Sequence, residues 1–242
     1  MMGGFVTLFA VLFFGGMQEY FYIEQLEKGV KQYVLDEDRS KDILTDLKKS
    51  NDIIKAFNKN RKRKQSEFLS MNLDPDIERE DFDDFFDQRE EERIALQEVM
   101  LESRLNVVSK IHDDEWQNTI AISDAVVEKE NKNSDPFESV MQTINRTIKD
   151  NNSQAQAIVL TQNFQIRFTQ FEDEVNSFKS EESTFLNNKN TTAREFQSLD
   201  KNMNLLRKTA YKAFVDFHFD MKEITSEIEW LKVMKSINKL IA

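Results

Sequence analysis

Residues 196–221, FQSLDKNMNLLRKTAYKAFVDFHFDM, carry the apolar pattern that decides the fold. Apolar side chains recur here at steps of three and four residues, which is the spacing of one face of an α-helix. The stripe runs through Phe196, Leu199, Met203, Leu206, Ala210, Ala213, Phe217 and Met221, and it continues to Ile224, Ile228 and Leu231. The stretch therefore predicts a long helix that buries a narrow seam against other helices.

Residues 164–185 show the same rhythm, and weaker versions of it occur in the first half of the chain. Stripes of this kind pack helices side by side, within one chain or between chains. We predict that the packed seam includes Phe164, Phe168, Phe171, Phe178, Leu199, Leu206, Phe217 and Ile224. A cofactor pocket is the alternative interpretation of an aromatic stripe, but packing is the simpler one, and we expect no cofactor.

Glycine and proline are rare, and their positions indicate an all-α fold. No glycine follows Gly29, and the two prolines are Pro75 and Pro136. Sheet proteins need turns, which depend on such residues, so a β-rich fold is excluded. Hydrophobic residues make up 39% and charged residues 32% of the chain, a mixture typical of long, solvated helices.

Helix-start signals divide the chain into four predicted helices. Asp74-Pro75 and Asp135-Pro136 combine an N-cap with a first-turn proline, and Thr192-x-x-Glu195 has the spacing of a capping box. These signals predict long helices at about 17–66, 76–131, 136–187 and 192–241, with the polar stretch 149–156 as a candidate break in the third. We expect them to form an antiparallel bundle or a coiled-coil-like rod over residues 25–242.

The first seventeen residues, MMGGFVTLFAVLFFGGM, contain no charge. A helix over residues 2–23 would reach about 33 Å, enough for the hydrocarbon layer of a bilayer, with tyrosines at the interface. We predict a single membrane anchor over residues 1–24 that contacts lipid through residues 1–23, including Phe5, Leu8, Phe9, Leu12, Phe13, Tyr20 and Tyr22. A buried core helix is the alternative, whereas a cleaved export signal lacks its basic start and its cleavage motif.

The side of the membrane follows from the nearest basic residues. Lys28 and Lys31 both lie after the apolar run, so the positive-inside rule places the bulk of the chain on the cytosolic side.

Composition excludes several classes of function. The formal net charge is −11, which argues against nucleic-acid binding, and the absence of cysteine removes thiolate chemistry. His112 and Glu115 share one helix face, but alone they are half of a metal site. We therefore expect no metal site, no catalytic residues and no enzymatic activity.

Residues 80–87, EDFDDFFD, stand out as a partner-binding candidate. On a helix, Phe82, Phe85 and Phe86 share one face, and Asp83 and Asp84 keep the segment soluble. Such rings could anchor a basic partner. In the alternative, the rings pack within the chain and the acids face the basic run 59–64, KNRKRK.

These observations together predict a membrane-anchored structural protein. It would act as a scaffold, a tether or an accessory subunit of a membrane complex, and it would bind other subunits or itself through helical seams. A sensory or regulatory helical bundle is the first alternative. A soluble helical enzyme with a buried N-terminal helix is the second.

Overall fold

The computed structural model describes residues 8–14, 23–120 and 137–241, and every secondary-structure element in these ranges is a helix. The elements are η1 (Ala10–Phe14, a π-helical turn), α2 (Ile23–Tyr33), α3 (Glu37–Met71), α4 (Arg79–Ser109), α5 (Asp113–Ile120), α6 (Glu138–Thr147), α7 (Asn151–Asn187), α8 (Ala193–Ile224) and α9 (Glu227–Ile241). The predicted all-α bundle is confirmed.

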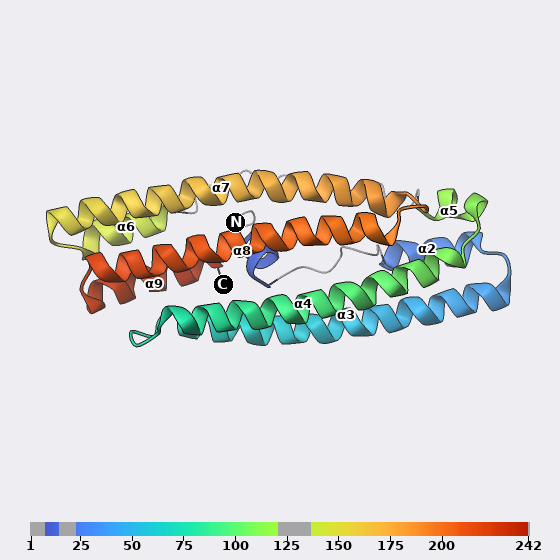
Figure 1. The fold of residues 1–242 in the computed structure, drawn as a ribbon, viewed down its shortest axis with the longest axis horizontal. Coiled ribbons are helices and arrows are strands. Elements are labelled where there is room, and N and C mark those ends of the chain that lie inside the picture. The colour runs from blue at the N-terminus through green and yellow to red at the C-terminus, as the bar shows by residue number, and fades with distance from the viewer. Residues whose placement is uncertain (1–7, 15–22, 121–136, 242) are drawn as a thin grey trace.

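Four long helices, α3, α4, α7 and α8, run along the length of an elongated bundle (Figure 1). Helix α8 is the central one, because it packs on α7, α4, α9 and η1. The shorter helices close the two ends: α2 and α5 pack together at one end, and α6 and α9 pack together at the other. The central place of α8 agrees with its having the longest apolar stripe in the sequence.

Each predicted long helix is divided or ends early, because polar side chains start a new helix within it. Asp36 accepts a hydrogen bond from the backbone N–H of Arg39 and begins α3, and Asp150 accepts one from Ser153 and begins α7. The α8–α9 break is set by Ser226, whose N–H and hydroxyl both donate to the Glu229 carboxylate. The side-chain cap supplies the hydrogen bonds that the interrupted helix loses.

The Asp74-Pro75 prediction was wrong in position. Helix α4 begins at Arg79 and is capped by a reciprocal box between Glu78 and Asp81, whereas Asp74 accepts from the N–H of Asp76 within the preceding turn. The Thr192–Glu195 capping box is confirmed at the start of α8. Asp135 and Pro136 lie outside the described residues.

The interior of the bundle contains two hydrophobic clusters. The aromatic core surrounds η1 and includes Phe9, Phe13, Phe68, Phe82, Phe86, Phe164, Phe168, Phe214, Phe217 and Trp230. The aliphatic core lies towards α2 and α5 and includes Leu26, Val30, Ile43, Leu47, Leu96, Met100, Val107, Ile111 and Trp116. Together they bury apolar side chains from all four long helices.

The predicted seam residues lie inside the bundle up to the end of α8. Phe164, Phe168, Phe171, Leu199, Leu206 and Phe217 are buried, and Phe178 and Ile224 are half-buried. Beyond Ile224 the predicted stripe holds only in part, because the break at 225–226 resets the register, and Leu231 is half-buried against the aromatic core. Ile228 is 69% exposed, and Trp230 is buried in its place.

No helix among the described residues is long and apolar enough to cross a membrane. The described part of the predicted anchor, residues 8–14, is a short helical segment inside the bundle. The expected continuous N-terminal helix is therefore not found in the part of the chain that the structure describes, and these residues instead pack as the core-helix alternative predicts.

Candidate functional site

The rings of the predicted partner-binding segment point into the bundle. Phe82, Phe85 and Phe86 are at most 5% exposed, and Phe86 stacks on Tyr211 with ring centroids 4.1 Å apart. Asp83 and Asp84 are exposed on the opposite side of α4. All three rings are buried in the aromatic core, so they are not exposed for binding a partner. The geometry therefore favours the alternative, in which the rings pack within the chain.

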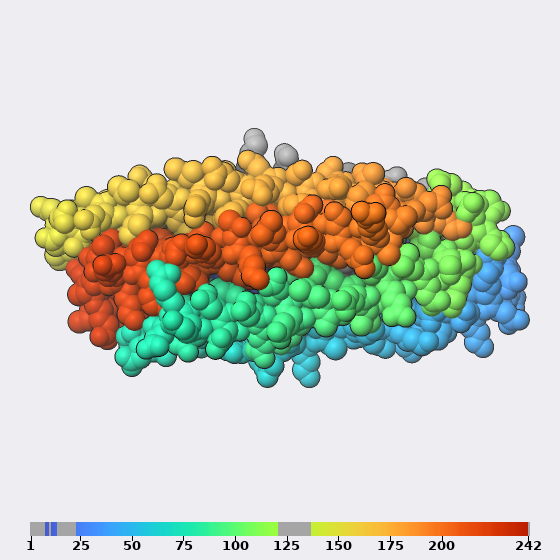
Figure 2. All heavy atoms as spheres, viewed as in Figure 1, coloured from blue at the N-terminus to red at the C-terminus, as the bar shows by residue number. Residues whose placement is uncertain are grey.

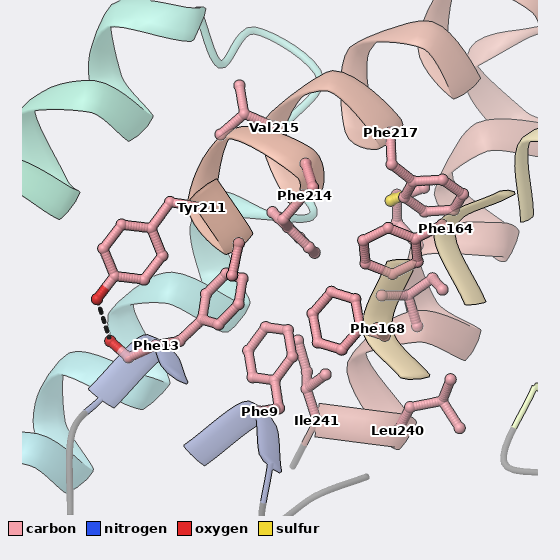
Figure 3. Packing of buried hydrophobic residues seen from close by; sticks show 14 of the residues in the cluster. Phe9, Phe13, Phe164, Phe168, Tyr211, Phe214, Val215, Phe217, Leu240 and Ile241 are labelled. Carbon is pink, nitrogen blue, oxygen red and sulfur yellow. Dashed lines mark hydrogen bonds between the residues drawn. The ribbon is translucent and has the colours of Figure 1, made fainter. Parts of the chain in front are cut away.

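Four of the predicted anchor residues lie in the aromatic core. Leu8, Phe9, Leu12 and Phe13 are at most 5% exposed, and Phe5, Tyr20 and Tyr22 lie outside the described residues. Figure 3 shows Phe9 and Phe13 directed towards Phe168 and Phe214. The segment therefore fills the centre of the bundle with side chains that the sequence assigned to lipid.

A polar layer separates the two cores at the middle of α4 and α8. It consists of Arg89, Arg93, Gln97, Asp200, Asn204 and Arg207. Gln97 donates to the Asp200 carboxylate, at 2.9 Å, and accepts from the Asn204 amide nitrogen, at 3.0 Å. Arg89 pairs with Glu92. Three guanidinium groups in this layer are completely buried, which is unusual in proteins.

Arg93 and Arg207 meet at one oxygen atom. The Arg93 Nε and the Arg207 Nη1 both donate to the Oδ1 of Asn204, each at 3.0 Å. The Arg93 Nη1 also donates to the hydroxyl of Tyr211, at 3.1 Å. Burial lowers the pKa of Arg93, and the guanidiniums of Arg207 and Arg89 lower it further. The guanidinium of Arg93 therefore lies beside that of Arg207 in a medium of low dielectric constant.

The N-terminal segment caps this layer with backbone oxygens. The Arg207 Nε donates to the carbonyl of Val11, at 3.3 Å, and the Tyr211 hydroxyl donates to the carbonyl of Phe13, at 3.4 Å (Figure 3). Carbonyls at the end of a helical turn lack partners within it, and a cation there is favourable. Both contacts are long, so the segment is held mainly by its apolar packing.

His218 forms a second buried polar group, in the aromatic core. Its Nδ1 lies 2.8 Å from the Oδ1 of Asn72, and the Asn72 amide nitrogen donates to the Oδ1 of Asn238. Burial lowers the pKa of His218 to about 3, with smaller effects from the positive charges of Lys222 and Arg79. The imidazole is therefore neutral at physiological pH and joins α8 to the ends of α3 and α9.

His112 and Glu115 do not share a helix face as the sequence predicts, because His112 lies just before the start of α5. The two residues instead cap that helix. Glu115 accepts from the backbone N–H of His112 and forms a two-bond ion pair with Arg39, with both N–O distances 2.6 Å. This pair joins α3 to α5. Over the described ranges, no group of three or more metal-binding side chains comes together.

The buried arginines are the functional candidates that sequence reasoning missed. A signal for them exists: Arg89, Arg93 and Gln97 continue the three-to-four-residue steps from Phe86 to Met100, so they occupy core positions of α4. A charged residue in a core register predicts either a break in the seam or a buried polar layer.

The chain matches no protein-family model, and no curated protein or solved structure shows significant similarity to it. The function is therefore argued from this geometry and from the sequence.

Proposed function

We propose that the protein is a membrane-associated structural protein, a helical scaffold that pairs with a second copy of itself through α7. The observation that carries the proposal is an uncharged stripe on the exposed side of that helix. We call it the outer stripe, and it consists of Ala155, Val159, Gln162, Ile166 and Thr169, all of which are exposed.

The outer stripe has the spacing of a helix-pairing seam. Val159 and Ile166 are seven residues apart and are 53% and 58% exposed, although both are large apolar residues. Gln162 and Thr169 stand at the intermediate positions of the heptad. Exposed apolar residues at this spacing are typical of a surface that another helix covers.

Charge also favours this face for self-association. Two copies of a chain with a net charge of −11 repel each other over most of their surface. Residues 151–171 contain a single charged side chain, Arg167, so this half of α7 is where repulsion is weakest. Helix α7 also lies at an edge of the bundle, beside α8 and away from α4 (Figure 2). In an antiparallel pair, Val159 of one copy would lie near Ile166 of the other.

The membrane part of the proposal rests on the apolar N-terminal sequence. Residues 1–17 lack charge, and residues 8–14 favour any apolar environment, whether the aromatic core or a bilayer. We propose that the segment exchanges between these two sites, so that the bundle is held at a membrane when the segment inserts.

Paired substitutions in the outer stripe test the scaffold. Val159→Glu with Ile166→Glu should convert a dimer into a monomer in light scattering, since four carboxylates would face one another in the pair. The matched control is Val99→Glu with Leu105→Glu, two exposed apolar residues of α4, which should leave the dimer intact. A monomeric wild-type chain at micromolar concentration would contradict the proposal.

Alkaline carbonate extraction tests the membrane part separately. The full-length chain, expressed in cells, should remain in the membrane pellet, because one inserted apolar segment resists this treatment. Its release into the supernatant would contradict the proposed membrane attachment. The proposed self-association would not be affected, because light scattering tests it independently.

A further inference from the structure

The polar layer at the centre of the bundle holds more hydrogen-bond donors than its acceptors satisfy. The Nη2 of Arg93 has no hydrogen-bond partner among the described residues, although this side chain is completely buried. The two acceptors that Arg93 does have, the Asn204 Oδ1 and the Tyr211 hydroxyl, are neutral. A buried guanidinium that is bonded only to neutral groups destabilises the fold, which indicates that this arginine has a role other than stability.

The neighbours of Arg93 point to a ligand of negative charge. The guanidinium of Arg207 shares the oxygen of Asn204 with it, and Arg89 lies one turn away on α4. Like charges this close repel each other in a low-dielectric interior, and an anion between them relieves the repulsion. Planar guanidinium groups are also the side chains that bind oxyanions with two parallel hydrogen bonds.

We propose that Arg93 and Arg207, together with the hydroxyl of Tyr211, form a buried site for a phosphate group. Their donors come from two helices and now reach separate acceptors, which are the Asn204 Oδ1 and the carbonyls of Val11 and Phe13. A tetrahedral oxyanion, which carries more acceptor oxygens than a planar carboxylate, suits several separate donors better. A phosphate group would also supply the negative charge that the two described partners of Arg93, both of them neutral, do not provide.

Access to this site depends on the N-terminal segment. The carbonyls of Val11 and Phe13 now accept from Arg207 and Tyr211 through bonds of 3.3 and 3.4 Å, which are long enough to be replaced by stronger, charge-assisted bonds. A phosphate group would take the place of these carbonyl oxygens, so its binding and the seating of residues 8–14 compete. The site itself does not require membrane attachment or dimerisation.

Thermal unfolding of the full-length chain tests the site with inorganic phosphate as the probe. Sodium phosphate should raise the Tm by about 3–5 °C over sodium chloride of equal ionic strength, once phosphate reaches about ten times its Kd. Sodium acetate at the same ionic strength should give a much smaller increase. An equal effect of acetate would overturn the assignment to phosphate.

Arg93→Met separates a ligand site from a structural arginine. In chloride it should raise the Tm by about 2–4 °C, because it removes a buried charge while Asn204 keeps its bond to Arg207 and Tyr211 keeps its bond to Phe13. It should also abolish the response to phosphate. The matched control, Arg167→Met on the exposed side of α7, should keep that response.

Arg93→Lys provides a second variant that keeps the charge but loses the forked donor. Its affinity for phosphate, measured by calorimetry, should fall at least about tenfold. Unchanged phosphate binding in both Arg93 variants would overturn the proposal, as would a lower Tm for Arg93→Met in a chain that does not respond to phosphate.

A lipid headgroup is the other source of the same chemistry, and vesicles distinguish it. The full chain is floated with phosphatidylcholine vesicles with and without phosphatidic acid. Extra binding that requires both phosphatidic acid and Arg93, without a response to inorganic phosphate, assigns the site to a lipid phosphate. A response to neither source overturns the site but leaves the scaffold proposal unaffected, because light scattering and carbonate extraction do not depend on Arg93.

Discussion

The aromatic core and the aliphatic core bury the same four long helices, but they do so with different side chains. Counted over the described residues, twelve buried phenylalanines lie in the aromatic core and two in the aliphatic core. The aromatic core must also fill the space around η1, where Phe9 and Phe13 contact rings from α3, α7 and α8. A fifth element widens the bundle, and large rings fill a wide interior without leaving cavities.

The aliphatic core is closed by short helices instead of by rings. Helices α2 and α5 pack against each other there, and Gly29 brings their backbones together: a Cβ atom at Gly29 would lie 2.8 Å from the Cα of Thr119. Ion pairs surround this end, with Asp46 bound to Lys110 and Arg39 bound to Glu115. The comparison shows that the two cores are stabilised differently. Large aromatic side chains fill the interior of the aromatic core, whereas close backbone contact between α2 and α5 and nearby ion pairs stabilise the aliphatic core.

Truncation of a central ring should give the largest effect. Phe214 is completely buried and contacts rings from η1, α3, α4 and α7. Phe214→Ala should lower the free energy of unfolding by roughly 3–5 kcal/mol, measured by urea denaturation, because it leaves a cavity that rigid rings cannot close. The control is Ile228→Ala, an exposed residue, which should change stability by less than about 0.5 kcal/mol. Equal effects would mean that the aromatic core is not packed as described.

Between pH 7 and pH 5, the free energy of unfolding should depend on pH through His218 in the aromatic core. The pKa of His218 is lowered from 6.5 to about 3 in the folded chain, so the unfolded chain binds a proton first as the pH falls. Stability is therefore complete above pH 6.5 and decreases towards pH 3, with a loss of about 2 kcal/mol between pH 7 and pH 5.

Urea denaturation across this pH range checks the effect of His218. His218→Asn should flatten the profile between pH 7 and pH 5. The matched control is His112→Asn, which changes a histidine whose side chain is exposed. A flat wild-type profile would show that His218 is protonated as easily in the folded chain as in the unfolded one.

A smaller effect is expected at the close approach in the aliphatic core. Gly29→Ala adds a methyl group that would lie 2.5 Å from the Cγ2 of Thr119, and the resulting overpacking should exceed the gain of about 1 kcal/mol in helix propensity. We expect a net loss of about 1 kcal/mol by thermal or urea unfolding. Adding Thr119→Ser, which removes that Cγ2 atom, should recover part of the loss. A stabilised Gly29→Ala variant would show that α2 and α5 are farther apart than described.

Local signals in the sequence were sufficient for the helices themselves. The scarcity of glycine and proline excluded a sheet, and the Thr192–Glu195 box placed the start of α8 correctly. The Ser226-x-x-Glu229 spacing carries the same information about the α8–α9 break. Such signals can be read from sequence because capping bonds and helical stripes involve residues three or four positions apart.

The candidate site could be predicted only in part. The sequence predicts the buried face of α8, which Leu206 and Phe217 mark. The spacing of apolar residues on α4 also shows that Arg93 occupies a core position. The partners in the site could not be predicted: Asn204 and the carbonyls of Val11 and Phe13 reach Arg93, Arg207 and Tyr211 from distant parts of the chain. No local rule relates residue 11 to residue 207.

The sequence by itself determined that this chain is helical, where several of its helices begin, and that their apolar stripes must be buried. Only the tertiary structure decided which apolar segments share the interior: the charge-free segment 8–14 and the rings of Phe82, Phe85 and Phe86 all lie in one core. The physical reason is that the hydrophobic effect depends on how much apolar surface is removed from water. It is not directional, so it does not determine which apolar segments pack against each other. That choice depends on shape and volume, which packing between distant helices determines.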